Sequence, residues 1–514
     1  MQMKLRYSLL FLRVQILSAE QIRAWDQYTI LHEPISSIDL MERAAKKCVE
    51  WIKARNWSQR RFHIFCGKGN NGGDGLAIGR MLLDEGYNIS IYILEFGKPG
   101  SDDFQFNLQR LEALTSTSLH FLQSDTSLPS INENEIIIDA LFGSGLNKPL
   151  DGLAAALVRH INTTNATRIS IDLPSGLFPD HSSIHNSVVG ANFTLTFQCY
   201  KIELLLQENA LFIGEVTVLD IGLHSSYLAN LTTTPFLLNE KIIRTIYKPR
   251  QRFAHKGTYG HALLVGGSFG KIGAMVLATK ACMRTGTGLM TAMIPGCGYT
   301  ILQTTSPEAM VIADSTETHL ANLPDDIEKF AAIGIGPGMG THAETQNIFS
   351  YLLRRFKKPM IIDADGLNIL SQNKEWLPLL PPYSILTPHP KEFDRLFGDH
   401  QNDVGRMEKA KQMAKELKII IVLKSHHSLV AFPDGDYCFN STGNAGMAKG
   451  GSGDVLTGIL SSLLAQGYTP LEAAQFGVYV HGWAGDFAAK CYSKEAMLPT
   501  HIINSLSSVF KALQ

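Results

Sequence analysis

Short apolar runs with the composition of buried β-strands recur along the whole chain. One such run comes about every 25 to 35 residues, and the residues between runs have the spacing of amphipathic helices. Strands that alternate with helices pair in parallel, because each helix carries the chain back to the end of the sheet where the next strand begins. We therefore predict an α/β protein built on parallel sheets.

The chain has 514 residues, which is too long for one ordinary hydrophobic core, so we expect two or three domains. The pattern of strands and helices weakens between residues 225 and 249, around the segment TTTP. A new strand then runs into Gly266, Gly267 and Ser268. We predict a first domain over residues 16–228, a linker over 229–248 and a second domain over 249–514.

The first 15 residues carry Lys4, Arg6 and Arg13 before any acidic residue. Their apolar stretch, residues 9–12, is shorter than the core of a secretory signal, and no small-residue cleavage site follows it. We predict a disordered leader over residues 1–15, or a misassigned start, rather than an export signal.

Composition excludes several classes of protein. A net charge of -1 and a pI near 7.0 argue against a nucleic-acid partner or a polybasic membrane surface. No apolar stretch approaches the roughly 18 residues that a membrane-spanning helix needs. The seven cysteines are scattered and never form C-x-x-C, which is typical of reduced thiols rather than of disulfides or a zinc site. We predict a cytoplasmic protein that binds neither nucleic acid nor membrane.

The sequence CGKGNNGGDG, residues 66–75, joins an apolar run to a helical pattern. It contains the G-x-G-x-x-G of dinucleotide-binding loops, and the next predicted strand ends at the acidic residue Glu95. This match is weak alone, because any tight turn from a strand to a helix selects glycine. Three polar residues are not needed for such a turn, and we interpret their oxygens as ligands for a cation or for ligand hydroxyl groups: Asn70, Asn71 and Asp74.

Acidic residues also stand at the ends of later predicted strands. Asp139 precedes the loop LFGSGLNKP, and Asp172 precedes LPSG. Ligands of open parallel sheets sit beyond the carboxyl ends of the strands. We therefore expect one crevice to be shared by Asn71, Asp74, Asp139, Asp172 and Ser175. The alternative for each residue is helix N-capping, and we assign Asp220, which no loop motif follows, to that alternative.

The strongest motif of the second half is GGSGDVLTGIL, residues 450–460. Glycines before an apolar helical run present free backbone N–H groups and the positive end of a helix, which together hold a phosphate. Asp454 follows these glycines and is placed to take a proton from a hydroxyl group as a phosphoryl group arrives. The alternative is that Asp454 caps the helix.

Three further positions are candidates for the same site. His389 lies between two prolines, where it either contacts substrate or is an ordinary loop residue. Lys424 ends the apolar run IIIVL, and a nucleotide contact is favoured because burial of an unpaired lysine is costly. The pair Asp363 and Asp365 either lines the site or caps a helix.

Eight motifs, taken in order, resemble those of the bifunctional NAD(P)H-hydrate repair enzymes. They are GNNGGDG, DALFGSGL, DLPSGL, HKGTYGHALLVGGS, GPGMG, DADGLN, TPHPKEF and GGSGDVLTG, and the resemblance covers the chain from about residue 16 onward. It implies a Rossmann-like, three-layer epimerase domain followed by a ribokinase-like α/β dehydratase domain. The epimerase would interconvert the R and S forms of hydrated NADH and NADPH (NADHX and NADPHX).

The same resemblance implies that the dehydratase restores the S form to NADH or NADPH. Bacterial-type members use ADP and eukaryotic ones ATP, and a one-chain fusion with no recognisable organelle signal is typical of bacteria or archaea. We therefore expect ADP to be consumed, with AMP and phosphate as products. It further implies a potassium ion in the epimerase, a magnesium ion with ADP in the dehydratase, and a homo-oligomer.

The residues that match the family's functional positions are implied in the same way. Catalysis is assigned to Asp172 and Asp454, and potassium to Asn71, Asp139 and Ser175. The epimerase substrate is assigned to Asn70, Asn71, Gly72, Gly73, Asp74, Gly143, Ser144, Gly145, Leu146, Asn147, Lys148, Pro149 and Asp172. The dehydratase substrate is assigned to Ala274, Gly338, His389 and Asp454, and the nucleotide to Lys424, Ser425, His426, His427, Ser428 and Gly453.

The chain departs from the family in two places. The nucleotide segment continues Ser-His-His-Ser, 425–428, where members usually have a small, glycine-containing stretch, and Asp-His-Ser, 180–182, replaces Asp-Thr-Gly after DLPSGL. Two alternative functions are a ribokinase-type kinase of a vitamin precursor fused to a non-catalytic Rossmann-like module, and a first half that binds ligand without turnover. The first-half motifs argue against the kinase, because such kinases lack them.

Overall fold

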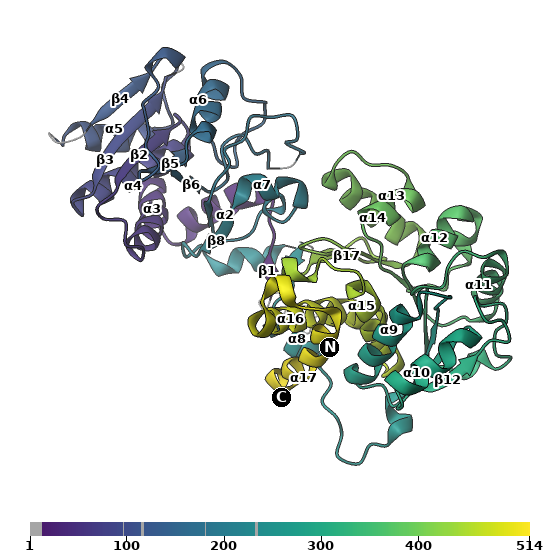
Figure 1. The fold of residues 1–514 in the computed structure, drawn as a ribbon. Helices are drawn as coiled ribbons and strands as arrows, with labels where there is room; N and C mark the ends of the chain where they lie inside the picture. The colour runs from purple at the N-terminus through teal and green to yellow at the C-terminus, as the bar shows by residue number, and fades with distance from the viewer. Residues whose placement is uncertain (1–12, 96, 115–117, 180, 232–234) are drawn as a thin grey trace. The chain divides into compact units, whose positions relative to one another are not determined.

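A computed structural model describes residues 13–95, 97–114, 118–179, 181–231 and 235–514 (Figure 1). The chain divides between residues 234 and 235 into two compact units, which we call the first and the second unit. Helices and strands alternate through both, as the sequence pattern predicts.

The first unit contains eight strands and six α-helices in its described residues. In chain order they are β1 (Val14–Gln15), α2 (Ala19–His32), α3 (Ser37–Lys53), β2 (Arg61–Cys66), α4 (Asn70–Asp84), β3 (Asn88–Leu94), α5 (Asp102–Glu112), β4 (Leu119–Leu122), β5 (Ile136–Ala140), α6 (Gly152–Thr163), β6 (Thr167–Ile171), β7 (Phe193–Phe197), α7 (Ala210–Ile213) and β8 (Glu215–Leu219). Short 3₁₀ helices are η1 (Asp125–Ser127), η2 (Ile202–Leu204), η3 (Gln207–Asn209) and η4 (Ser225–Asn230).

Seven of these strands form one parallel sheet in the order β4-β3-β2-β5-β6-β7-β8. The chain builds outward from β2 to β4 and then returns to continue from β5 on the other side. The loops that follow β2 and β5 therefore diverge, and such a switch point is where open parallel sheets bind ligands.

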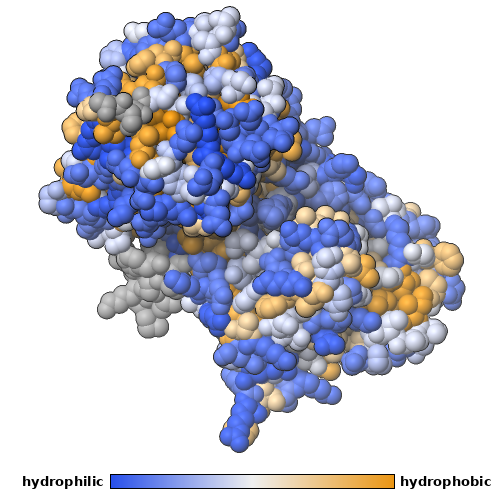
Figure 2. Space-filling view, turned by 60° about the vertical axis from the view of Figure 1, so that its left-hand side comes forward, coloured by the Kyte–Doolittle hydropathy of each residue, from blue (hydrophilic) through white to orange (hydrophobic). Residues whose placement is uncertain are grey.

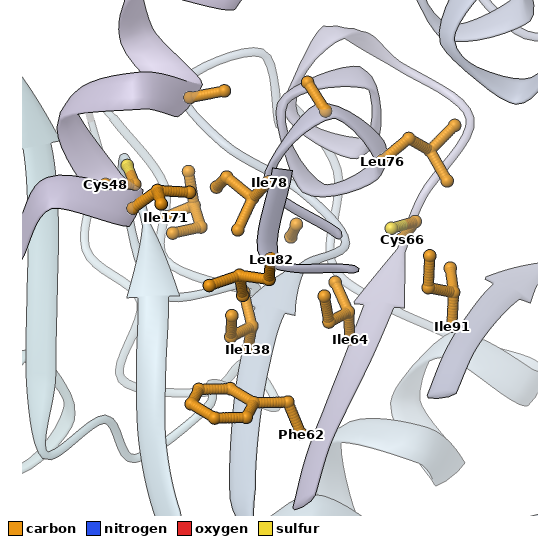
Figure 3. Close-up of a cluster of buried hydrophobic side chains, with 14 of the residues drawn as sticks. Cys48, Phe62, Ile64, Cys66, Leu76, Ile78, Leu82, Ile91, Ile138 and Ile171 are labelled. Atoms are coloured by element: carbon orange, nitrogen blue, oxygen red, sulfur yellow. The ribbon is translucent and has the colours of Figure 1, made fainter. Parts of the chain in front are cut away.

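Alternation along β2 places successive side chains on opposite faces of the sheet. Phe62, Ile64 and Cys66 pack with Ile78 and Leu82 of α4 in a buried cluster (Figure 3). The opposite face carries a second buried cluster, in which residues of the sheet pack against α6: Phe65, Ile137, Leu157, Val158 and Ile161. Helices thus cover both faces, and the predicted three-layer Rossmann-like arrangement is confirmed.

The second unit is formed by β9 (Phe236–Leu237), α8 (Glu240–Ile246), β10 (His261–Val265), α9 (Ile272–Thr285), β11 (Leu289–Ile294), α10 (Tyr299–Thr305), β12 (Met310–Ala313), β13 (Ala332–Ile335), α11 (Ala343–Arg355), β14 (Met360–Ile362), α12 (Asp365–Gln372), β15 (Ile385–Leu386), α13 (Pro390–Phe397), α14 (Asp403–Leu417), β16 (Ile420–Leu423), β17 (Leu429–Ala431), β18 (Tyr437–Phe439), α15 (Ser452–Ala465), α16 (Pro470–Ala496) and α17 (Pro499–Leu513). Its 3₁₀ helices are η5 (Lys256–Tyr259), η6 (Gly296–Gly298), η7 (Ile327–Lys329), η8 (Lys374–Leu379) and η9 (Ala445–Met447).

Its sheet has the order β9-β18-β17-β16-β15-β14-β13-β10-β11-β12. Pairing is parallel from β12 through to β16, and β17 is antiparallel to both of its neighbours. This is the expected ribokinase-like α/β fold. The switch point lies between β10 and β13, and the loops after these strands touch: Gly267 N–H donates to Pro337 O over 2.8 Å.

Two of the predicted boundaries need correction. Residues 14 and 15 were expected in a disordered leader, yet they form β1, and the neighbouring Ile16 and Leu17 are buried, which accounts for their order. The predicted linker, 229–248, includes β9 and α8 of the second unit, because Phe236, Leu237, Ile242 and Ile243 are buried there. Residues 1–12 and 232–234 lie outside the described residues.

Hydrophilic side chains predominate on the face of the molecule in Figure 2, and hydrophobic ones lie in separate patches. Among the described residues, no helix is both long enough and apolar enough to cross a membrane.

Candidate functional site

A pocket of about 600 Å³ opens beside the switch point of the first unit, a volume within the range of small-molecule sites. The loops after β2, β5 and β6 and helix α2 contribute to its wall. The lining residues are Ile22, Arg23, Asp26, Lys68, Gly69, Asn70, Asn71, Asp74, Leu141, Phe142, Gly143, Ser144, Gly145, Leu146, Asn147, Asp172, Phe197, Gln198, Ile221 and Leu223.

Asp172 follows β6 with a left-handed backbone, φ 67°, a conformation that concentrates at functional sites. Lys201 Nζ lies 2.6 Å from its Oδ1, and Ser144 N–H donates to Oδ2 over 3.3 Å. Burial alone would raise the pKa of Asp172, but Lys201 and hydrogen bonds from Ser144 together outweigh burial and hold this pKa below its ordinary value. The residue caps no helix, so the capping alternative is wrong for Asp172, which presents a charged carboxylate to the pocket.

Asn71 and Asp172 meet at Gly143. A Cβ atom at Gly143 would lie 3.2 Å from Asn71 Oδ1 and 3.2 Å from Asp172 Oδ2. The amide oxygen and nitrogen of Asn71 are both buried, and neither has a hydrogen-bond partner among the described residues. Buried polar atoms normally have partners, so these atoms are available to a ligand or an ion.

Asp139 and Ser175 lie behind the pocket wall. Both are fully buried, Ser170 Oγ and Ser175 N–H each donate to Asp139 Oδ2 over 2.8 Å, and the Ser175 hydroxyl donates to Oδ1. Burial raises the pKa of Asp139, and these hydrogen bonds oppose that rise. Asp139 also accepts a hydrogen bond from Leu141 N–H, so its carboxylate holds the loop after β5 to the loop after β6. It does not line the pocket itself.

The three glycines of the G-x-G-x-x-G pattern, Gly67, Gly69 and Gly72, have different surroundings, and the predicted substrate contact of Gly72 needs revision. Added Cβ atoms at Gly67 and Gly72 would lie 1.9 Å from Leu141 O and 1.7 Å from Gly67 O, so these glycines allow close packing of protein against protein. Of these three glycines, only Gly69 lines the pocket, and a Cβ atom added there would meet no atom within 4 Å. Glu95 accepts a hydrogen bond from Lys68 of this loop.

Four of the residues predicted to bind the epimerase substrate do not line this pocket: Gly72, Gly73, Lys148 and Pro149. A Cβ atom at Gly73 would lie 2.8 Å from the Met41 side chain, which shows that this glycine is needed for packing. The predicted Asn70, Asn71, Asp74, Asp172 and residues 143–147 do line it.

Sequence reasoning missed Asp26 and Lys201. Lys201 could have been found from the sequence in the same way as Asp139 and Asp172, because it is a charged residue shortly after a strand, β7. Asp26 lies within α2 and carried no such signal. Burial and the charge of Asp172 raise the pKa of Asp26 to about 7, and Lys201 opposes that rise.

In the second unit, α15 begins without a side-chain cap. Its N-cap is Gly451, with φ 101°, and the N–H groups of Gly453 and Asp454 have no acceptor among the described residues. Asp454 is the third residue of the helix, and the capping alternative is wrong for it. This start has the free N–H groups and positive dipole that bind anions.

A charged network lies beside this helix start. Lys424 Nζ contacts Asp363 Oδ1 at 2.8 Å, and Thr457 Oγ1 donates to Asp363 Oδ2 over 2.9 Å. A Cβ atom at Gly453 would lie 3.4 Å from both Lys424 Nζ and Asp363 Oδ2, which brings the predicted nucleotide residues Lys424 and Gly453 together.

The network sets the charges of its members. Burial opposes the charge of Lys424, but Asp363 and Glu392 outweigh burial and raise its pKa above the ordinary value. Burial and the charge of Asp363 raise the pKa of Asp454 to about 7, while Lys424 opposes that rise. Asp454 can therefore accept and release a proton near neutral pH.

His389 is the N-cap of α13. Its Nδ1 accepts hydrogen bonds from the N–H groups of Lys391 and Glu392, and its Nε2 lies 3.4 Å from Glu392 Oε1. Burial and the charge of Lys424 lower the pKa of His389. These contacts fix the orientation of the His389 imidazole at the start of α13, next to the charged network.

The other predicted residues of this unit lie in two places. The Cβ of Ala274 is 3.2 Å from the Cβ position of Gly338, beside the loop where Gly340 N–H donates to Asp365 Oδ2 over 2.9 Å. Residues 425–428 form the turn between β16 and β17. Ser425 Oγ donates to His427 O over 2.8 Å, and burial lowers the pKa of His427 to about 4.

Fold and site together define a two-unit α/β enzyme. One unit holds a charged carboxylate in a pocket, and the other holds a carboxylate at an anion-binding helix start. Residues 262–508 match the family model described as "NAD(P)H-hydrate dehydratase", and residues 37–202 match the model described as "YjeF-related protein N-terminus". The chain belongs to the family of bifunctional NAD(P)H-hydrate repair enzymes.

Curated relatives match nearly the whole chain. It is 35% identical to the bifunctional NAD(P)H-hydrate repair enzyme Nnr of Moorella thermoacetica, over 97% of each chain. The enzyme Nnr of Escherichia coli and the bifunctional NAD(P)H-hydrate repair enzyme of Leishmania braziliensis are each 31% identical, over 92% of this chain and 89% of theirs. These matches span both units and favour the repair family over the kinase alternative.

Among solved structures, one is described as an ADP/ATP-dependent NAD(P)H-hydrate dehydratase from Bacillus subtilis co-crystallised with ATP and Mg²⁺. It is 31% identical and covers 55% of this chain and 100% of that one, with a TM-score of 0.47.

Proposed function

We propose that this protein repairs hydrated NADH and NADPH with two activities on one chain. The first unit epimerises R- and S-NAD(P)HX, and the second dehydrates the S form to NAD(P)H while ADP is converted to AMP and phosphate. The observation that carries this proposal is the match to repair enzymes over 97% of the chain. In support of it, each unit has a site with an acidic residue beside a lysine.

In the first unit, Asp172 acts as the base of the epimerisation. The two forms differ at C6 of the nicotinamide ring, so interconversion breaks the C6–O bond and reforms it on the other face, which needs proton transfer. A carboxylate held in its charged form by Lys201 can take the proton of the water that adds back. Residues 143–147 and Asn70 line the same pocket, and we assign to them the contacts with the hydrated ring or its phosphates.

We assign a potassium ion to Asn71, Asp139 and Ser175. The observation that fits is Asn71, whose buried amide atoms lack partners among the described residues. The donors are amide, carboxylate and hydroxyl oxygens, which suit a hard cation. When bound, the ion supplies positive charge next to a pocket that also holds Asp26, Asp74 and Asp172.

In the second unit, Asp454 takes the proton of the C6 hydroxyl of S-NAD(P)HX as that oxygen attacks the terminal phosphate of ADP. The N–H groups of Gly453 and Asp454, which have no acceptor among the described residues, stabilise the moving phosphoryl group at the helix start. Phosphate then leaves C6 with the electron pair of the C–O bond, and the ring nitrogen assists. Ala274, Gly338 and His389 are assigned to the substrate, and Lys424 with residues 425–428 and Gly453 to the nucleotide.

We assign the magnesium ion to the phosphates of ADP rather than to a cage of protein ligands. Mg²⁺ commonly binds through substrate phosphates with few carboxylates, and the carboxylate of Asp363 already has the charge of Lys424 at 2.8 Å, which disfavours a second cation there. When bound, the ion neutralises phosphate charge. The cytoplasmic location, the homo-oligomeric state and the absence of nucleic-acid and membrane partners stay predictions.

The test is to incubate the purified full chain with a mixture of R- and S-NADHX, with and without ADP, and to follow the absorbance of NADH. We expect NADH to form completely from both epimers only with ADP, with AMP, phosphate and NADH in equal amounts. NADH without AMP would contradict the phosphorylation step. Faster turnover with ATP at equal concentration would overturn the choice of ADP.

A second assay addresses the kinase alternative. Vitamin-precursor alcohols are offered with ATP, and product phosphate esters are measured. Phosphorylation of such an alcohol, with no NADH produced from NADHX, would favour the kinase.

A further inference from the structure

Asp26 lines the same pocket as Asp172 and lies on a helix whose other face is fixed. Ile22, Trp25 and Thr29 of α2 are buried, and Trp25 Nε1 donates to His224 O over 2.9 Å. Ile22 and Asp26, one helical turn apart, both line the pocket. The anchored face therefore directs the carboxyl group of Asp26 to the wall that also holds Asp172.

The two carboxyl groups have unequal surroundings. Lys201 contacts Asp172 at 2.6 Å, whereas no hydrogen bond or ion pair joins the Asp26 side chain to another described residue. When one of two neighbouring acids pairs with a cation, the paired acid stays charged and the other retains its proton to higher pH. Burial and the charge of Asp172 accordingly raise the pKa of Asp26 to about 7.

The groups that surround Asp26 come from several elements. Asp172 follows β6, Lys201 and Cys199 follow β7, Asp74 belongs to α4, and Lys68 precedes α4. Arg23, on α2 itself, also lines the pocket.

Epimerisation at C6 needs both an acid and a base. In the first half-reaction a proton adds to the C6 hydroxyl and the C–O bond breaks; water leaves with the bonding electrons, and the ring nitrogen pair forms an iminium ion. In the second, water attacks C6 from the other face and loses one proton. The protons balance over the cycle, so no oxidant or co-reactant is needed.

We propose that Asp26 is a second catalytic residue of the epimerase, the acid that protonates the departing hydroxyl group while Asp172 serves as the base. The assignment deepens the proposed function of the first unit and rests on it. Asp74 is the competing acid of the pocket. Burial and the charges of Asp172, Asp26 and Asp103 raise its pKa well above the ordinary value, so it retains its proton and cannot exchange it as readily.

The test uses the full chain without ADP, so that dehydration does not interfere, and follows conversion of R- to S-NADHX by chromatography. Asp26→Asn should lower kcat by about a hundredfold or more, the usual contribution of a general acid. KM should change by no more than about twofold, because an amide resembles the protonated acid in shape. Asp26→Glu should restore part of the rate.

The pH profile separates catalysis from a structural role. The wild-type rate should fall as the pH rises through about 7, where Asp26 loses its proton, and Asp26→Asn should lose that decline. The matched control is Glu20→Gln, which removes a charge from an exposed position on the same helix and should leave rate and profile unchanged.

Two failures are distinguishable. If Asp172→Asn abolishes conversion but Asp26→Asn keeps the wild-type rate and pH profile, the role of Asp26 is wrong and the epimerase site stands. If both variants convert R-NADHX at the wild-type rate, the proposed epimerase function of this pocket itself fails. A change in KM alone would reduce Asp26 to a binding contact and overturn the assignment.

Discussion

Lys201 Nζ lies 2.6 Å from Asp172 Oδ1, and the Lys201 side chain is 2% exposed. The lysine also donates to Thr196 Oγ1 over 2.7 Å and to Phe197 O over 3.1 Å, so its position is held independently of Asp172. A fixed cation next to a buried carboxylate keeps the carboxylate ionised, which the proposed role of Asp172 as a base requires.

Removal of the cation should therefore reveal its role. Lys201→Met leaves the carboxylate of Asp172 buried and unpaired, which typically costs about 3–5 kcal/mol of stability. The pKa of Asp172 should rise, and epimerisation at neutral pH should fall with it. Denaturant unfolding and conversion of R-NADHX measure the two effects, and Lys46→Met, an exposed lysine of α3, is the control.

The loss of stability should depend on pH. In the wild type the folded pKa of Asp172 is below its unfolded value of 3.8, so this stabilisation is complete above that value and is lost as the pH falls through the folded pKa. The difference between wild type and Lys201→Met should thus be large at neutral pH and smaller below about pH 4. An equal difference at both pH values would contradict the ion pair as its cause.

Asp172→Asn keeps the size of the side chain but cannot take a proton. We expect R-to-S conversion to slow by roughly a hundredfold or more, with dehydration of S-NADHX unchanged. Asp220→Asn is the matched control, since Asp220 also follows a strand but is exposed and accepts a hydrogen bond only from Gly222 N–H among the described residues. Unchanged epimerisation in Asp172→Asn would reduce Asp172 to a structural role.

Asp454→Asn should abolish dehydration and leave both epimerisation and ADP binding largely intact. The wild-type dehydration rate should fall as the pH drops below about 7, because the base must be unprotonated and the pKa of Asp454 is about 7. Initial rates with S-NADHX at several pH values measure dehydration, and calorimetry measures the binding of ADP. Asp434→Asn, on an exposed turn, is the control. A near-normal rate in Asp454→Asn would rule out proton transfer by this residue.

Replacement of potassium by tetramethylammonium should slow epimerisation and leave dehydration unchanged. Asn71→Leu, a substitution of similar size, removes the unpartnered amide and should make the remaining epimerisation insensitive to the cation. Rates of R-NADHX conversion in the two salts at equal ionic strength are the measurement. The potassium assignment would be overturned if wild type and Asn71→Leu responded alike.

Much of the architecture is predictable, because it depends on local pattern. The apolar run 62–66 alternates its side chains between two buried faces, and the glycines after it permit a turn that residues with a Cβ would block. The acidic positions 139 and 172 could be found because the carboxyl ends of parallel strands meet at one edge. The linker was mispredicted because β9 is only two residues long and leaves too short a pattern.

The α/β class, the family, the position of Asp172 after a strand and the glycine loop before Asp454 all follow from the sequence pattern. Which acid is charged follows from the three-dimensional arrangement. Asp26, Asp172 and Lys201 are far apart in the chain, and their pKa values depend on burial and on the distances between them, which no local pattern contains. The same reason explains why Asp139 proved to be a buried hydrogen-bond acceptor behind the pocket.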